Sequence, residues 1–146
     1  MKRLTNLFVV ALLMLSFSVL TSSCKKDDAK YFVSFVFTGE IENVTFNAII
    51  SELDNKGKVL NSYECNNVTS GYQTKTYTAH NDAVKVQTDV SFVVNHPVYG
   101  EIKGENGWSF THALTENATT DITVSIKDIK ISIDINENVK AATLIK

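Results

Sequence analysis

Residues 84–94, VKVQTDVSFVV, decide the fold class of this chain. Valine or phenylalanine stands at every second position from Val84 to Val94, except at Thr88, and mostly polar residues stand between them. Successive side chains of a β-strand point to opposite faces of the sheet. The alternation therefore predicts a strand with one face in a core and the other in water.

The same alternation continues on both sides of this stretch. Strands are predicted over residues 31–37 and 44–50, where the apolar residues share one parity: Tyr31, Val33, Phe35 and Phe37, then Val44, Phe46, Ala48 and Ile50. Residues 54–57, DNKG, are typical of a turn. Further strands are predicted over residues 59–64, 71–79, 122–126, 129–135 and 139–145. The parity changes between 122–126 and 129–135, which predicts a bulge or tight turn near Lys127 and Asp128.

Residues 95–107 interrupt the alternation. They hold Pro97, the only proline, and three of the six glycines, Gly100, Gly104 and Gly107. Glycine and proline are the residues that most often form turns. We therefore expect a hairpin in which residues 98–103 and 108–114 pair across the segment 104–107.

The whole pattern predicts an all-β fold. The 146 residues suffice for one ordinary domain, and 44% hydrophobic with 21% charged residues is a globular composition. No apolar stripe with helical spacing follows residue 24. Seven to nine short strands separated by turns predict a single β-sandwich over residues 31–146. We expect an immunoglobulin-like or transthyretin-like Greek key, and a small barrel is the alternative.

The first 23 residues are predicted to be a cleaved signal peptide. Lys2 and Arg3 form a basic start, and residues 8–20 form a run that is apolar apart from Ser16 and Ser18. A basic start, a short apolar run and small residues after it are typical of secretory signals. A membrane-spanning helix needs about 20 apolar residues, so this run is too short for one.

The end of this segment resembles the lipobox of bacterial lipoproteins. Leu20, Thr21, Ser22 and Ser23 precede Cys24. The family usually has leucine three residues before the cysteine, where this chain has Thr21, and the relaxed lipoboxes of Bacteroidota-type lipoproteins tolerate this departure. The resemblance implies that Cys24 becomes the mature N-terminus and carries a thioether-linked diacylglycerol, usually with a further acyl chain on its amine.

The residues after Cys24 extend the resemblance. Lys26, Asp27 and Asp28 are similar to the signal that sends Bacteroidota lipoproteins across the outer membrane to the cell surface. We therefore expect an outer-membrane lipoprotein that faces the cell exterior, with residues 24–30 as the lipidated cysteine and a short polar tether. Two or three acyl chains give stable anchoring, since each buried methylene contributes about 0.8 kcal/mol. The alternating strands are also similar to those of small immunoglobulin-like lipoproteins of Bacteroidota.

The charges argue against nucleic-acid binding. The chain has 14 basic and 16 acidic residues, and removal of Lys2 and Arg3 leaves 12 basic ones and a net charge of −4. Arg3 is the only arginine, so the mature part lacks the side chain best suited to bind phosphate. A mildly acidic domain without arginine has no basic face for a phosphate backbone.

Catalytic and metal-binding patterns are missing from the sequence. His80, His96 and His112 each stand alone, without a second ligand at metal-binding spacing. No nucleophile, acid and base can be assigned, so we expect neither an enzyme nor a cofactor. Cys65 is the only cysteine besides Cys24, and we expect it to be a small buried apolar residue near a strand end.

One candidate ligand site remains. Tyr99, Trp108 and the segment 95–107 could present aromatic faces to a sugar at one end of the sandwich. The alternative is that Trp108 is a core residue, because it shares parity with Phe110 and Leu114. His112 has the same parity; we expect it at the rim of the core and include it in the candidate site.

Three functions stay open from the sequence. The first is a non-enzymatic surface lipoprotein that binds a glycan or a protein, or takes part in an outer-membrane complex. The second is an inhibitor or immunity protein that acts on a secreted enzyme or toxin. The third, an enzyme, is the least favoured. A tether of six residues spans at most about 20 Å, which favours a component of a membrane complex over a long-reach adhesin.

Overall fold

The computed structural model describes residues 28–136 and 139–145. The predicted signal peptide, Cys24, Lys26 and Asp27 lie outside the described residues. Within them all regular structure is β, as predicted, and the strands number ten where seven to nine were expected. They are β1 (Lys30–Gly39), β2 (Val44–Leu53), β3 (Val59–Val68), β4 (Tyr77–Thr78), β5 (Lys85–His96), β6 (Gly100–Lys103), β7 (Trp108–Ala113), β8 (Thr119–Ile129), β9 (Ile131–Ile135) and β10 (Lys140–Leu144).

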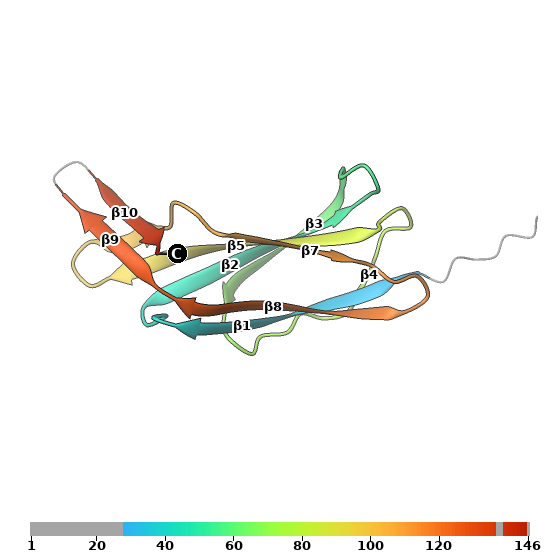
Figure 1. Cartoon of the computed structure of the whole chain (residues 1–146), viewed down its shortest axis with the longest axis horizontal. Helices are drawn as coiled ribbons and strands as arrows, with labels where there is room; N and C mark the ends of the chain where they lie inside the picture. The colour runs from blue at the N-terminus through green and yellow to red at the C-terminus, as the bar shows by residue number, and fades with distance from the viewer. Residues whose placement is uncertain (1–27, 137–138, 146) are drawn as a thin grey trace, which may run out of the picture.

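Two sheets form a sandwich (Figure 1). One has three strands in the order β4-β1-β8, and the other has five, β3-β2-β5-β6 with β7 also paired to β5. The pairs are antiparallel except β1 with β8, which is parallel. A third, two-stranded sheet is the β9–β10 hairpin, which lies at the opposite end from the start of β1 (Figure 1).

The core lies between the two sheets. The predicted inward residues of β1 are all buried, and Phe46, Ala48 and Ile50 are buried on β2. Phe37 and Phe46 stack across the sheets with ring centroids 4.3 Å apart. On β5, Val86, Thr88, Val90, Phe92 and Val94 are buried as predicted, while Val84 precedes the strand and is exposed. Cys65 is buried on β3, as expected for a small apolar residue.

The predicted hairpin between residues 98–103 and 108–114 is wrong. Both β6 and β7 pair with β5 and not with each other: His96 faces Gly100 and Val90 faces Trp108. The glycines between them serve close packing, because a Cβ at Gly104 would collide with the Phe92 ring and one at Gly107 with the Val90 carbonyl oxygen. β6 and β7 therefore pair one after the other with the same edge of β5, and residues 104–107 connect them.

The predicted strand over residues 71–79 is regular only at β4. Before it, side chains supplement a few backbone hydrogen bonds to β1. The Thr74 hydroxyl accepts a hydrogen bond from the Val33 N–H at 3.0 Å, and the Ser70 hydroxyl accepts one from the Phe37 N–H at 3.0 Å. The segment still follows β1, through a bridge between Ser34 and Gln73. It stays beside the sheet without forming a continuous ladder.

The predicted irregularity near Lys127 and Asp128 is confirmed. The β1–β8 register shifts between Phe37 and Gly39, and Asp128 has a φ of 54°. Gly39, with a φ of 118°, approaches the backbone of Ile129 so closely that a Cβ would collide with it. The bulge ends the sandwich part of the strand, and the chain continues into the β9–β10 hairpin.

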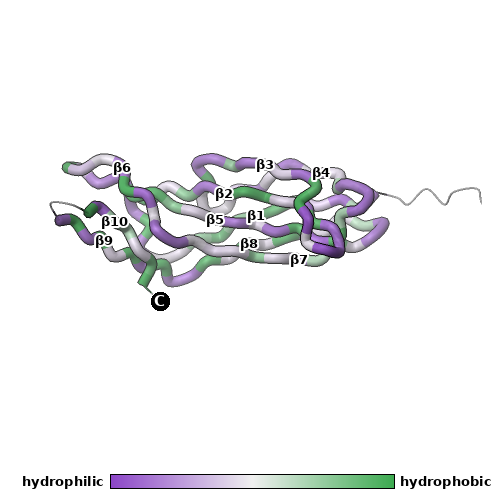
Figure 2. Tube along the Cα trace, turned by 90° about the horizontal axis from the view of Figure 1, so that it is seen from above, coloured by the Kyte–Doolittle hydropathy of each residue, from purple (hydrophilic) through white to green (hydrophobic). Residues whose placement is uncertain are grey.

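The domain begins slightly earlier than residue 31. Lys30 belongs to β1, and Ala29 packs against the core. The loops near β4 are mainly hydrophilic, while hydrophobic and hydrophilic residues alternate along the strands (Figure 2). No helix among residues 28–136 and 139–145 has the length and apolarity to cross a membrane.

Candidate functional site

Trp108 lines a groove at one edge of the sandwich. The groove lies where the edge of β7 faces the end of β8, and it has a volume of about 360 Å³. Its lining includes Ile126, Ile129 and Leu144, with Lys127 and Lys130 beside them. This volume is at the lower end of the range of small-molecule sites, roughly 300–1,000 Å³.

The indole of Trp108 is held by the core. Its ring centroid is 5.9 Å from that of Phe92 and 6.2 Å from that of Phe46, both in tilted contacts. The residue is half-buried at the start of β7, with Gly107 packed against β5 just before it. Trp108 therefore packs in the core and contributes only part of its surface to the groove. This agrees with the alternative prediction, in which Trp108 is a core residue.

Tyr99 lies at the tip between β5 and β6. Its ring is 44% exposed and contacts the His96 ring at a centroid distance of 4.9 Å. The Lys140 Nζ lies 5.2 Å from the centroid of the same ring, which is a cation–π geometry. Val98 beside it is 77% exposed. The tip is an exposed apolar feature backed by a residue of the β9–β10 hairpin.

His112 lies at the rim of the core, as expected. It faces Val86 across the β5–β7 pair and is half-buried. Its Nδ1 is buried and has no hydrogen-bond partner among the described residues. Its ring packs at the edge of the apolar interior, on the same side of β7 as Trp108 and Phe110.

The structure does not bring Tyr99, Trp108 and His112 together. Their partners on β5 are spread along the strand: Val86 for His112, Val90 for Trp108, and His96 near Tyr99. At about 3.3 Å per residue, Trp108 is roughly 13 Å from His112 and roughly 20 Å from the Tyr99 tip. A single small ligand cannot contact all three side chains.

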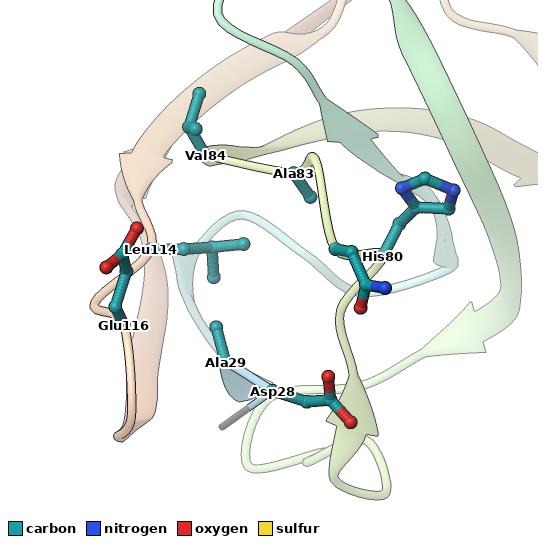
Figure 3. A pocket seen from close by; sticks show the side chains of 8 residues that line it. Asp28, Ala29, His80, Ala83, Val84, Leu114 and Glu116 are labelled. Atoms are coloured by element: carbon teal, nitrogen blue, oxygen red, sulfur yellow. The ribbon is translucent and has the colours of Figure 1, made fainter. Parts of the chain in front are cut away.

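A smaller hollow lies at the start of β1 (Figure 3). Its volume is about 80 Å³, room for only a few water molecules. Ala29, Ala83 and Leu114 point toward one another in it, with Asp28 and His80 toward the outside (Figure 3). Asp28, the described member of the proposed export signal, is exposed there. The hollow is too small for a sugar ring.

Glu52 is the chemically notable residue that the sequence analysis missed. It is fully buried, on the inward parity of β2 in phase with Ala48 and Ile50. The Tyr31 hydroxyl donates to its Oε1 at 2.9 Å and the Tyr63 hydroxyl at 3.4 Å. The Asn61 side-chain amide and the His80 backbone N–H both donate to its Oε2 at 2.9 Å.

The tyrosines around Glu52 remain protonated. Burial, followed by the hydrogen bond to Glu52, raises the pKa of Tyr31 well above its ordinary value of 10.0. Burial and then the charge of Glu52 raise the pKa of Tyr63. Tyr77, whose pKa is raised mainly by burial, packs between them, 5.3 Å from Tyr31 and 4.3 Å from Tyr63 between ring centroids. The hydroxyls of Tyr31 and Tyr63 are thus available as donors to Glu52.

This polar cluster is structural. Its donors come from β1, β3 and the segment after β4, so one carboxylate ties both sheets and a loop together. One feature of the sequence could have indicated this cluster: Glu52 shares the parity of the buried apolar residues of β2. Buried charges require partners, which here come from residues far apart in the chain.

No group of three or more histidine, cysteine or acidic side chains suited to a metal ion occurs within the described ranges. Comparison with protein-family models, with curated proteins and with solved structures returned no match.

Proposed function

We propose that this chain is a lipid-anchored lipoprotein of the bacterial outer membrane that faces the cell exterior. Its β-sandwich would bind a glycan or a protein without catalysing a reaction. The observation that carries the proposal is the sequence from Leu20 to Asp28, which combines a lipobox-like end, an acceptor thiol and an export-like signal. The anchor would be the acyl chains on Cys24.

The start of β1 supports a position close to the membrane. Ala29 already packs against the core, so four residues separate it from Cys24. They span at most about 14 Å. The hollow at Asp28 would then lie close to the bilayer. This arrangement supports a role as a structural component of an outer-membrane complex.

A second candidate, an inhibitor or immunity-type lipoprotein, is supported by the tip between β5 and β6. Val98 and Tyr99 project there with exposed apolar surface. Exposed apolar side chains at the end of a rigid scaffold suit insertion into a partner protein.

The environment of Glu52 supports a non-enzymatic role. Both of its oxygens accept hydrogen bonds from the protein, and its side chain has no exposed surface. A general acid or base must reach the proton that it transfers. This carboxylate therefore serves the fold rather than chemistry.

Palmitate labelling of cells that produce the full chain tests the anchor. Cys24→Ala should abolish labelling, because only this thiol follows the lipobox-like sequence. Cys65→Ala is the matched control: Cys65 is buried on β3, so the label should remain at the wild-type level. Label retained in Cys24→Ala would contradict the lipoprotein proposal.

Two binding assays separate the candidate partners. A glycan array probed with the purified protein tests for sugars, and a pull-down from solubilised outer membrane tests for proteins of a complex. Binding to a secreted enzyme or toxin with loss of its activity would favour the inhibitor.

A further inference from the structure

The outer edge of β8 is unpaired in the described part of the chain. β8 ends the three-stranded sheet, with β1 on its inner side. Its 11 residues make it one of the longest strands, and an unpaired edge of this length is a template for a further strand.

The backbone direction on this edge follows from the β1 pairing. The Lys30 N–H donates to the Ala118 carbonyl, so even-numbered residues of β8 point their backbone groups toward β1. Odd-numbered residues, from Thr119 to Lys127, point theirs outward. The side chains alternate between the two faces of the sheet: Ile122, Val124 and Ile126 are buried, whereas Asp121 and Lys127 are exposed.

The side chains on this edge are complementary to themselves. In an antiparallel pair of two β8 strands centred on Val124, each Asp121 faces the Lys127 of the other copy. Each Thr123 faces Ser125, and each Ile122 faces Ile126. These facing pairs match in chemistry, and the ion pair forms twice, once on each side of the two-fold axis.

The register is selective. A shift of two residues in either direction removes both ion pairs, because it places Asp121 opposite Ser125 or Ile129. A lone lysine on an edge strand would repel a second copy. Here Asp121 and Lys127 lie three residues on either side of Val124, so each lysine faces an aspartate of the other copy and attracts it. Neither side chain has an ion-pair partner within the described residues.

We propose that β8 pairs antiparallel with β8 of a second copy of this chain, centred on Val124. The two three-stranded sheets then form one continuous six-stranded sheet, and both cores continue across the junction. The groove beside Ile126 and Ile129 leaves space for the start of the partner strand. The bulge at Asp128 limits the pairing to residues 121–127, because beyond it the Ile129 carbonyl accepts a hydrogen bond from the Glu40 N–H at the end of β1.

Disulfide trapping in membranes of cells that produce the full chain tests the register. One tagged copy carries Thr123→Cys and a differently tagged copy carries Ser125→Cys. Hydrogen-bonded antiparallel partners have Cα atoms about 5.5 Å apart, within disulfide range. A cross-linked dimer with both tags is expected on oxidation. Thr119→Cys with Thr123→Cys is the matched control: these positions would be roughly 20 Å apart and should not cross-link.

Exchange of the charges tests whether the ion pairs between Asp121 and Lys127 hold the two copies together. Asp121→Lys or Lys127→Asp, added to the Thr123→Cys and Ser125→Cys copies, places like charges opposite each other twice. Either change should reduce the cross-linked fraction roughly tenfold. The double variant Asp121→Lys with Lys127→Asp restores opposite charges and should recover the dimer. Both side chains are exposed, so folding should be retained, as resistance to protease will report.

Three outcomes would overturn the proposal. The first is no cross-link between positions 123 and 125 above the control. The second is a cross-link that the charge variants leave unchanged. The third is trapping of the Thr123→Cys copy to a different protein, which would identify another occupant of this edge.

Discussion

At the scale of single residues, Glu52 links the two sheets of the sandwich through its hydrogen bonds. Its carboxylate accepts hydrogen bonds from Tyr31 on one sheet and Asn61 on the other. It also accepts one from the His80 backbone N–H, which holds the segment after β4. The parity of β2 was sufficient to predict that this position faces inward. The donors were beyond prediction, because they come from residues up to 28 positions away in the chain.

We expect Glu52→Ala to destabilise the domain far more than Glu52→Gln. Alanine leaves four buried or part-buried donors unpaired, at a cost of about 3 kcal/mol or more in the free energy of unfolding. Glutamine keeps a carbonyl oxygen for Asn61 and His80, and its amide can donate to the Tyr31 hydroxyl, so the loss should be about 1 kcal/mol. Urea denaturation measures both. Equal losses would mean that the side chain acts through its volume and not through its hydrogen bonds.

At the scale of elements, alternation predicted individual strands well and their partners poorly. Parity alone places Val86, Val90 and Phe92 in the core, because it is a local property of one strand. The segment 104–107 has the composition of a turn, but Gly104 and Gly107 are required where the chain packs on Phe92 and Val90. A glycine needed for close packing and one needed for a turn are identical in sequence. The same limit applies to the predicted site, since strand pairing sets the separation of Trp108 from the Tyr99 tip.

The register of β5 gives a sharp test at this scale. Val90 lies between Ala48 on β2 and Trp108 on β7 and is 2% exposed. Val90→Asp buries an unpaired carboxylate, which costs several kcal/mol of a total stability of roughly 5–15 kcal/mol and should unfold the domain. Asp89→Asn is the adjacent control. Asp89 accepts hydrogen bonds from the Gln87 amide, and asparagine keeps one acceptor oxygen. Thermal melts that show equal stability for the two variants would contradict this register.

At the scale of the whole molecule, the core begins at the start of the described residues, where Ala29 already packs against it. The described core is built entirely from residues after Asp28, apart from the hollow that Asp28 itself lines. The division into a signal segment, a polar tether and a sandwich stays a prediction, which rests on the argument that a charged run does not join an apolar core. In the proposed lipoprotein the start of β1, at one end of the sandwich, would be the part of the domain nearest the anchor (Figure 1).

Replacement of Lys26, Asp27 and Asp28 by alanine should change the location of the protein and not its fold. Asp28 is exposed, so its loss removes no buried contact. Lipidation at Cys24 should continue, since the lipobox-like residues are intact. A protease that cannot enter cells should digest the wild-type domain on intact cells and leave the triple variant protected in the periplasm. Equal protection of both proteins would mean that the domain faces the periplasm, and glycans or proteins outside the cell could not be its partners. Equal digestion would keep the surface location but exclude these three residues as its cause.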